Sequence, residues 1–168
     1  SPASILQFWF GDAIDDVAVN AEKAPLWWGK NPEQDAQITA EFAPTLRAAA
    51  TGELDEWADS AASCLALIIT LDQFPRVIYR DTPEAFGCDA KAREVCEQGL
   101  AKGLDCELRN IERIFFYLPL EHSEELADQD HSIRRYQGLA DSATAEQQSL
   151  FKGTLEYAHA HRDIIVRF

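Results

Sequence analysis

Residues 61–76 read Ala-Ala-Ser-Cys-Leu-Ala-Leu-Ile-Ile-Thr-Leu-Asp-Gln-Phe-Pro-Arg and form the most apolar stretch of the chain. The apolar side chains recur every three or four residues and also fill the opposite face. This pattern predicts a helix over Ala61–Leu71 that is buried all round. Pro75 disfavours helical backbone at the residue before it, so the helix ends or kinks there. The segment therefore predicts a core helix that delivers an acid, an amide and an arginine to one corner.

Helical periodicity continues on both sides of this segment. Gly11–Lys30 shows no clear period and is interpreted as a long irregular connection, of a kind that often carries function. The chain shows no strand hairpin and no alternation of strands and helices. We predict an all-α fold of about seven helices in antiparallel pairs, packed as an α-α superhelix or an irregular bundle. The other predicted helices are Ser4–Phe10, Asp35–Ala50, Thr82 to about Lys102, Asp105–Pro119, Ser123 to about Gly138, and Ser142 or Thr144 to Phe168.

Length and charge narrow the class of protein. The 168 residues contain no linker-like stretch, which predicts a single helical domain over residues 1–168. With 29 acids against 15 bases, the net charge of −14 argues against nucleic acid and anionic membranes as partners. The apolar run Ala61–Leu71 is far shorter than the roughly 20 residues of a membrane span. Most arginines lie at or beyond Arg76, so an anion site is expected in the second half.

The use of the four cysteines indicates whether the protein lies in an oxidising or a reducing compartment. None forms a Cys-x-x-Cys pair, so no zinc ribbon or thioredoxin motif is predicted. No signal-peptide pattern opens the chain. We therefore expect free thiols, a cytoplasmic location and no cofactor.

The first polar cluster follows the core helix. An acid beside the most apolar helix must be paired or solvated, and Arg76 and Arg113 are the candidate partners of Asp72. One interpretation is a corner locked by a buried Asp–Arg pair. The other is a pocket for an anion or carboxylate, because planar arginine side chains suit bidentate contacts. Its candidate residues are Asp72, Gln73, Arg76, Arg80 and Arg113.

The second cluster surrounds His122. Ser123 followed by Glu124 and Glu125 fits the start of a helix, which is the structural interpretation. His122 can instead act as a general acid or base, together with Asp72 or Glu124. No Gly-x-Ser-x-Gly surrounds Ser123, so a hydrolase nucleophile elbow is not supported.

A third pattern concerns metal binding. Glu156 and His159 have the Glu-x-x-His spacing of di-iron bundles, and Asp128 and His131 repeat it with aspartate. Exposed charged helices produce such pairs by chance, so these four residues are weak metal candidates. The aromatic residues Phe8-Trp9-Phe10, Trp27-Trp28 and Trp57 are interpreted as core, or alternatively as the lining of an apolar groove.

Taken in order, these motifs resemble the bacterial domain-of-unknown-function family 924 over essentially the whole chain. The resemblance implies a tetratricopeptide-like α-α superhelix and no established activity, cofactor or substrate. Family members usually continue beyond an Arg-Phe pair like Arg167-Phe168, so we expect either a C-terminal segment that this chain lacks or a departure in this member. The motifs are Phe8-Trp9-Phe10-Gly11, Leu71-Asp72-Gln73-Phe74-Pro75-Arg76, Tyr117-Leu118-Pro119-Leu120, His122-Ser123-Glu124, Gln129 and His161.

Four hypotheses about function follow from the sequence. The first is a cytoplasmic helical-repeat protein that binds a small anionic ligand or a peptide terminus through Arg76, Arg113, Arg80, Gln73, His122 and Ser123. The second is a hydrolase or lyase that uses His122 with Asp72 or Glu124. The third is a carboxylate metal protein. The fourth is a protein-interaction scaffold in which the polar clusters only fasten helix corners. The sequence leaves the oligomeric state open.

Overall fold

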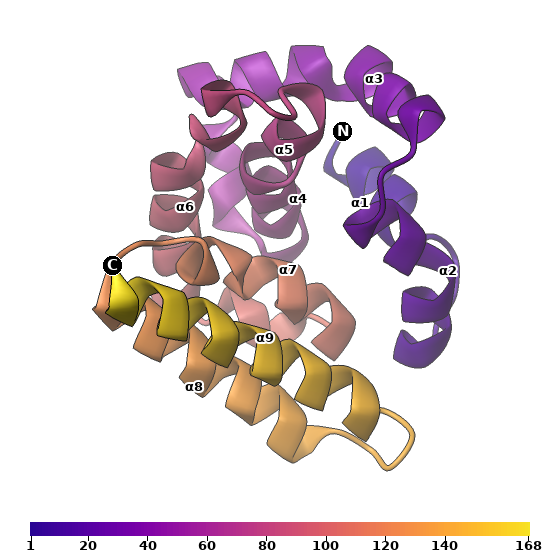
Figure 1. The fold of residues 1–168 in the computed structure, drawn as a ribbon. Helices are drawn as coiled ribbons and strands as arrows, with labels where there is room; N and C mark the ends of the chain where they lie inside the picture. Colours follow the sequence, from indigo (N-terminus) through magenta and orange to yellow (C-terminus); the bar gives the residue numbers. More distant parts are fainter.

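The computed structural model describes residues 1–168 and consists of helices joined by short connections (Figure 1). It contains no strand, so the predicted all-α class is confirmed. The α-helices are α1 (Pro2–Phe10), α2 (Asp16–Trp28), α3 (Pro32–Thr51), α4 (Ala61–Asp72), α5 (Phe74–Ile78), α6 (Asp89–Ala101), α7 (Asn110–Glu121), α8 (Leu126–Ser142) and α9 (Gln148–Arg167). Three short 3-10 turns complete the chain: η1 (Asp55–Asp59), η2 (Pro83–Phe86) and η3 (Leu104–Glu107).

Helix α4 is the centre of the core. From Cys64 to its end every residue is buried, and α1, α3, α6 and α7 pack around it. Thr70, a polar residue of this helix, donates its hydroxyl proton to the carbonyl of Ala66, so it costs little to bury. The stretch Ala61–Ile78 has the length and hydropathy of a membrane span, but 72% of it is buried inside the protein. The prediction of a core helix buried all round is confirmed.

The predicted irregular connection Gly11–Lys30 is wrong, because α2 occupies most of it. Asp15 starts the helix, and its carboxylate accepts a hydrogen bond from the backbone N–H of Ala18. Only Val19 and Trp27 bury apolar side chains, and this wide spacing leaves almost no periodic signal. Trp27 packs edge-on against Phe10 and Phe115, so tertiary contacts with the aromatic core hold the helix in place.

Several predicted helix boundaries also change at prolines and glycines. The helix predicted from Thr82 to about Lys102 is divided into η2 and α6 near Gly87, and Phe86 at this break is exposed. Pro119 lies inside the last turn of α7, where losing one backbone N–H does not end the helix. Helix α8 continues past Gly138 to Ser142, and α9 starts later than predicted. Together with α2 and the separate α5, these changes give more helices than predicted.

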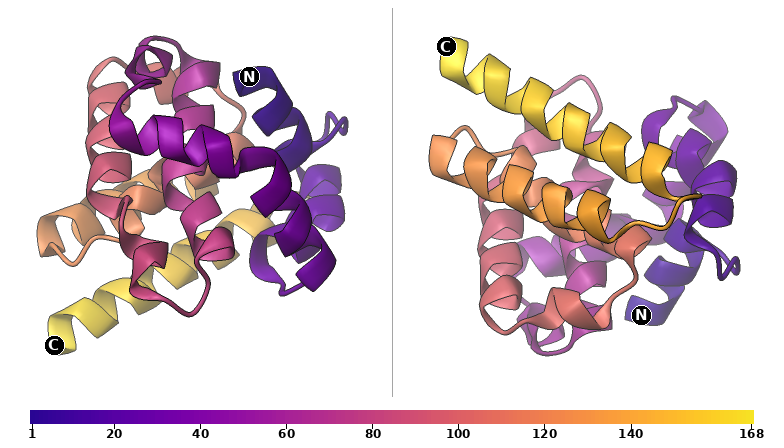
Figure 2. Two further views of the ribbon diagram at one scale, coloured as in Figure 1. Left: turned by 90° about the horizontal axis from the view of Figure 1, so that it is seen from above. Right: turned by 90° about the horizontal axis from the view of Figure 1, so that it is seen from below.

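Helices α8 and α9 form an antiparallel hairpin that lies across the rest of the molecule (Figures 1 and 2). Helix α9 packs mainly against α8 and also contacts α7. The hairpin therefore covers the end of α7, where the chain continues into His122. This arrangement brings the last helix beside the polar corner that follows α4.

Candidate functional site

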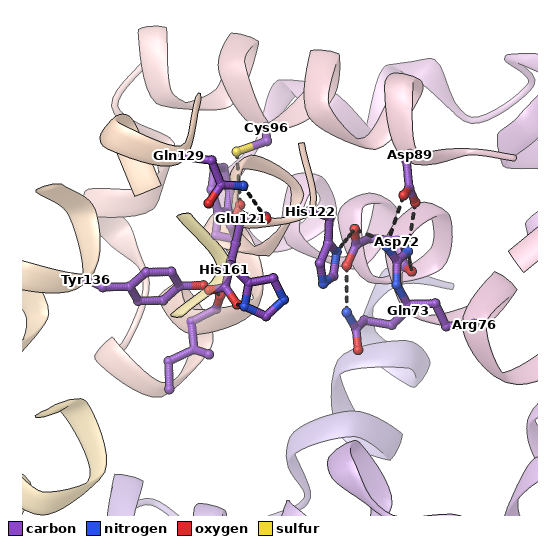
Figure 3. Close-up of polar contacts among 12 residues, drawn as sticks. Asp72, Gln73, Arg76, Asp89, Cys96, Glu121, His122, Gln129, Tyr136 and His161 are labelled. Atoms are coloured by element: carbon purple, nitrogen blue, oxygen red, sulfur yellow. Dashed lines mark hydrogen bonds and ion pairs between the residues drawn. The ribbon is translucent and has the colours of Figure 1, made fainter. Parts of the chain in front are cut away.

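The end of α4 places a buried carboxylate against an imidazole. The Asp72 side chain is only 1% exposed, and its Oδ1 lies 2.8 Å from Nδ1 of His122. Gln73 donates a 2.6 Å hydrogen bond to the other carboxylate oxygen. Arg76 Nη1 lies 3.7 Å from Oδ1 and donates to the backbone carbonyl of Asp72 at 2.7 Å. Figure 3 shows His122, Gln73 and Arg76 gathered around this acid.

Gln129 on α8 holds the backbone on both sides of His122. Its Nε2 donates to the carbonyls of Glu121 and Ser123, each at 2.6 Å, and the residue is fully buried. Because the two carbonyls flank His122, one side chain fixes the turn that presents the imidazole. The position of His122 is therefore set from α8 as well as from α7.

A second carboxylate–imidazole pair lies beside the first. Glu121 has a side chain 3% exposed, and its Oε1 lies 3.1 Å from Nδ1 of His161 on α9. The centroids of the His122 and His161 rings are 6.4 Å apart. Figure 3 shows the pairs next to each other, with Tyr136 beside Glu121. Neighbouring residues at the end of α7 thus serve two pairs, one directed to α4 and one to α9.

Both imidazoles line a pocket of about 480 Å³. Its walls come mainly from α7 and α9, and Trp28 at the end of α2 completes them. Trp28 stacks on Phe115 at 5.6 Å and remains 56% exposed. The pocket is thus mainly apolar, with the polar groups concentrated at Glu121 and the two histidines. The lining residues are Trp28, Ile114, Leu118, Glu121, His122, Tyr136, Leu150, Gly153, Thr154, Tyr157 and His161.

The environments of the two acids shift their pKa values in opposite directions. Burial by itself would raise the pKa of Asp72, but His122, Arg76 and Gln73 together hold it below its usual range. Burial raises the pKa of Glu121, and the nearby His161 and His122 only partly offset this effect. Carboxyl groups whose pKa values are driven apart are typical of acid–base sites.

His122 also borders a smaller polar crevice of about 280 Å³. There the Ser123 hydroxyl donates a 2.6 Å hydrogen bond to Asp128 and accepts one from Arg93. It also accepts from the backbone N–H of Glu125, but the predicted helix start at Ser123 is wrong, because α8 begins at Leu126 with Glu125 as its N-cap. Glu124 is exposed at the crevice.

Two of the three predicted arginines form ion pairs with aspartates, and the third binds backbone carbonyls. Arg76 binds Asp89 in a bidentate contact at 2.7 and 3.0 Å, next to Asp72. Arg80 makes a bidentate pair with Asp35 on α3. Arg113 donates to the carbonyls of Leu108 and Cys106 instead of pairing with Asp72. None of the three lines the pocket, and Arg113 is wrong as a partner of Asp72.

The four weak metal candidates do not converge. Asp128 accepts hydrogen bonds from Ser123 and Arg93, while His131 accepts one from Arg135. Glu156 and His159 lie on the exposed side of α9. No group of three or more His, Cys, Asp or Glu side chains has the geometry to hold a metal ion.

Comparison with known proteins assigns the chain to a family. The family model described as "Bacterial protein of unknown function (DUF924)" matches residues 5–168. The chain belongs to this family. A solved structure of a protein of unknown function from Agrobacterium tumefaciens is 32% identical, with a TM-score of 0.82. The match covers 99% of this chain and 83% of that one. No curated protein matches the sequence.

In this DUF924 chain, the sequence offered Asp72 as one of two alternative partners of His122, and it missed most of the pocket. Trp28 lay in the segment interpreted as irregular, although the aromatic residues as a group carried the alternative of an apolar groove. Glu121 was not among the candidate residues. His161 entered only through the family resemblance, and its partner lies 40 positions upstream. Tyr136 gave no signal at all.

Proposed function

We propose that this DUF924 protein is an acid–base enzyme, a hydrolase or lyase, that acts on a small and largely apolar molecule. The observation that carries the proposal is the 2.8 Å contact between His122 Nδ1 and the buried Asp72 at the edge of the pocket. Imidazole is the commonest general acid or base in enzymes, and a carboxylate that orients it is the usual support.

Each member of the pair has a distinct role in this proposal. A Nδ1 proton donated to Asp72 leaves the lone pair of neutral His122 on Nε2, which has no protein hydrogen-bond partner. Asp72 has a lowered pKa, so it stays ionised and stabilises the imidazolium that forms when Nε2 takes a proton. Because Glu124 is exposed and makes no contact with the imidazole, Asp72 is the favoured partner of His122.

A second candidate function uses the same pocket without catalysis. Two imidazoles on one apolar cavity favour a small anionic ligand or a peptide terminus, because protonated imidazole nitrogens donate to carboxylates. In this alternative the histidines supply the positive charge, since the side chains of Arg76 and Arg80 are already paired with aspartates. The high acid content and free cysteines favour a cytoplasmic location with no nucleic-acid partner in either case.

The test combines a ligand screen with matched histidine variants. Purified protein is screened by thermal shift against small apolar acids, esters, amides and alcohols, and each hit is assayed for turnover. Loss of the general base in His122→Gln should reduce turnover about 100-fold or more. His159→Gln is the control, because that residue is exposed and lies outside the pocket. Unchanged turnover in folded His122→Gln would rule out His122 as the general base, while saturable binding without turnover would favour the second candidate.

A further inference from the structure

The two carboxylate–imidazole pairs share one cavity but differ at Nδ1. His122 is hydrogen-bonded to Asp72, whereas Nδ1 of His161 lies 3.1 Å both from Glu121 and from the backbone carbonyl of Tyr157. Each Nδ1 lies beside a buried carboxylate, at 2.8 Å in one pair and 3.1 Å in the other. Neither Nε2 atom has a hydrogen-bond partner in the protein. Both rings line the pocket, with their centroids 6.4 Å apart. One small functional group bound between the rings can therefore contact both.

We propose that Glu121 and His161 form the proton-donating pair of this site, opposite the proton-accepting Asp72–His122 pair, and that the substrate is a carboxylic ester with an apolar acyl group. The inference rests on the proposed function and gives it a substrate class. It assigns His161 as a catalytic residue and Glu121 as a positioning residue that acts through it.

The opposite roles follow from the number of protons on each pair. Glu121 is buried in a mainly apolar pocket, and its raised pKa favours keeping a proton within the Glu121–His161 pair. The carbonyl of Tyr157 lies 3.1 Å from His161 Nδ1 and can only accept, so Nδ1 carries a hydrogen. A second proton on the ring, which the buried Glu121 carboxylate stabilises at 3.1 Å, is then on Nε2 and can be donated. Asp72 ionises readily beside Arg76 and Gln73, so His122 is left with an Nε2 lone pair that accepts. The site thus holds one acid and one base.

The pocket lining indicates water as the nucleophile. The hydroxyls of Thr154 and Tyr136 donate to the backbone carbonyls of Phe151 and Ile114. Tyr157 is exposed, and the pocket contains no serine or cysteine. A water molecule activated by His122 remains the simplest attacking group, and an acid on the opposite side matches addition to a carbonyl.

The hydrolysis balances with water as the only co-reactant. The water oxygen bonds to the ester carbonyl carbon while one of its protons passes to Nε2 of His122. His161 stabilises the negative carbonyl oxygen through its Nε2–H. The bond between that carbon and the alcohol oxygen then breaks, and the alcohol oxygen takes the proton from His161. The products are the carboxylic acid and the alcohol, and solvent exchange returns the proton from His122 to the Glu121–His161 pair.

The acyl group is inferred from the walls of the pocket. Ile114, Leu118 and Leu150 are aliphatic, and Trp28 and Tyr157 present aromatic surface. A volume of about 480 Å³ lies in the range of small-molecule sites. A phenylacetyl group is therefore a suitable probe, since its ring can pack against the aromatic residues.

The experiment compares two esters of phenylacetic acid that differ only in the leaving group. Methanol is a poor leaving group and needs a proton from the enzyme, whereas para-nitrophenolate leaves without one. In His161→Gln we expect hydrolysis of the methyl ester to fall about 100-fold or more and that of the nitrophenyl ester less than about ten-fold. In His122→Gln both should fall about 100-fold, because both need the base. His159→Gln, on the same helix, should keep both rates.

Every outcome decides the assignment. Equal losses of the two esters in His161→Gln overturn its acid role and leave that of His122 standing. If wild-type protein hydrolyses neither ester, the substrate class is overturned, and the His122 proposal is still judged by its own screen. Glu121→Gln gives an independent measurement if His161→Gln does not fold. It should reproduce the selective loss and flatten the pH profile of the methyl ester, whereas a merely structural role of Glu121 would leave that profile unchanged.

Discussion

Two buried acids of this protein, Asp105 and Asp72, have similar partners and different surroundings. Asp105 on η3 accepts a 2.7 Å hydrogen bond from Tyr117 and lies 3.4 Å from Nη1 of Arg135. Arg135 also stacks over the Tyr117 ring and donates to His131. Asp72 is equally buried, but the imidazole beside it lines a cavity.

The difference between the two clusters shows which structural feature indicates a functional site. Burial of an acid against a basic group occurs in both clusters, so it does not by itself separate a structural pair from a functional one. In the Asp105 cluster Nε2 of His131 already accepts from Arg135, and no residue of the cluster lines the pocket. At Asp72 the imidazole keeps a free nitrogen on the cavity. A partnerless imidazole nitrogen at a pocket is therefore the more specific signal.

The largest expected effect is on stability at Asp105. Asp105→Ala leaves Tyr117 without its acceptor and Arg135 without a buried counter-charge, which should lower the free energy of unfolding by about 3–5 kcal/mol. Urea titration followed by circular dichroism measures it. Esterase or other pocket activity of the folded fraction should be unchanged, and a selective loss of activity would place Asp105 in the site.

A smaller effect is expected at the other end of that hydrogen bond. Tyr117→Phe removes one donor from the buried Asp105 and should cost about 1–3 kcal/mol of unfolding free energy. The ring packing against Tyr136 is retained. A cost below about 0.5 kcal/mol would show that Arg135 alone satisfies the acid.

The two acids near the pocket should give opposite pH dependences of stability. Asp72 has a lowered pKa in the folded protein, so its contribution is present above its ordinary pKa of 3.8 and is lost as pH falls further. The pKa of Glu121 is raised, so its contribution is present below the ordinary value of 4.5 and is lost as pH rises through the folded value.

Isosteric amides at these two positions measure the dependences. The destabilisation caused by Asp72→Asn should shrink as pH is lowered toward acid. Glu121→Gln should gain stability relative to wild type as pH rises from about 4.5. Urea unfolding of the three proteins at several pH values gives both slopes. Slopes of the same sign would contradict the separation of an acid and a base within the pocket.

The smallest effect is expected at His131. His131→Gln keeps an acceptor for Arg135 at the edge of the Asp105 cluster, so it should change the unfolding free energy by less than about 0.5 kcal/mol. Thermal denaturation together with the pocket assay measures it. A loss of activity comparable to that of His122→Gln would remove the distinction between the clusters.

The sequence predicted local features well and distant pairings poorly. The apolar period of Ala61–Leu71 and the proline at 75 indicated the core helix and its corner, since both signals lie within a few residues. The same corner indicated that Asp72 needs a partner, and Arg76, one of its two candidate partners, lies 3.7 Å from it. His122 was paired with Asp72 only in the enzyme hypothesis, as an alternative to Glu124. Helix α2 was missed because an aromatic core, not its own periodicity, holds it.

The Glu121–His161 pair could be recognised only once the fold was known. Nothing in the spacing of these residues indicates that α9 returns across the end of α7, and a burial-raised pKa depends on walls from several helices. The arginines show the opposite problem. From the sequence alone, Arg80 and Arg113 were candidates for binding an anion. In the structure, Arg80 forms an ion pair with Asp35, and Arg113 donates to the backbone carbonyl of Leu108.

The packing of α9 has a consequence for access to the pocket. This helix rests mainly on α8 and supplies the wall from Leu150 to His161. Partial opening of the α8–α9 hairpin would uncover the cavity and part His161 from Glu121 while α4 stays folded. Amide hydrogen exchange should therefore release the α9 protons earlier than those of α4, and a molecule held between the two imidazoles should slow that release. A bound molecule would then stabilise the closed position of the α8–α9 hairpin over the pocket.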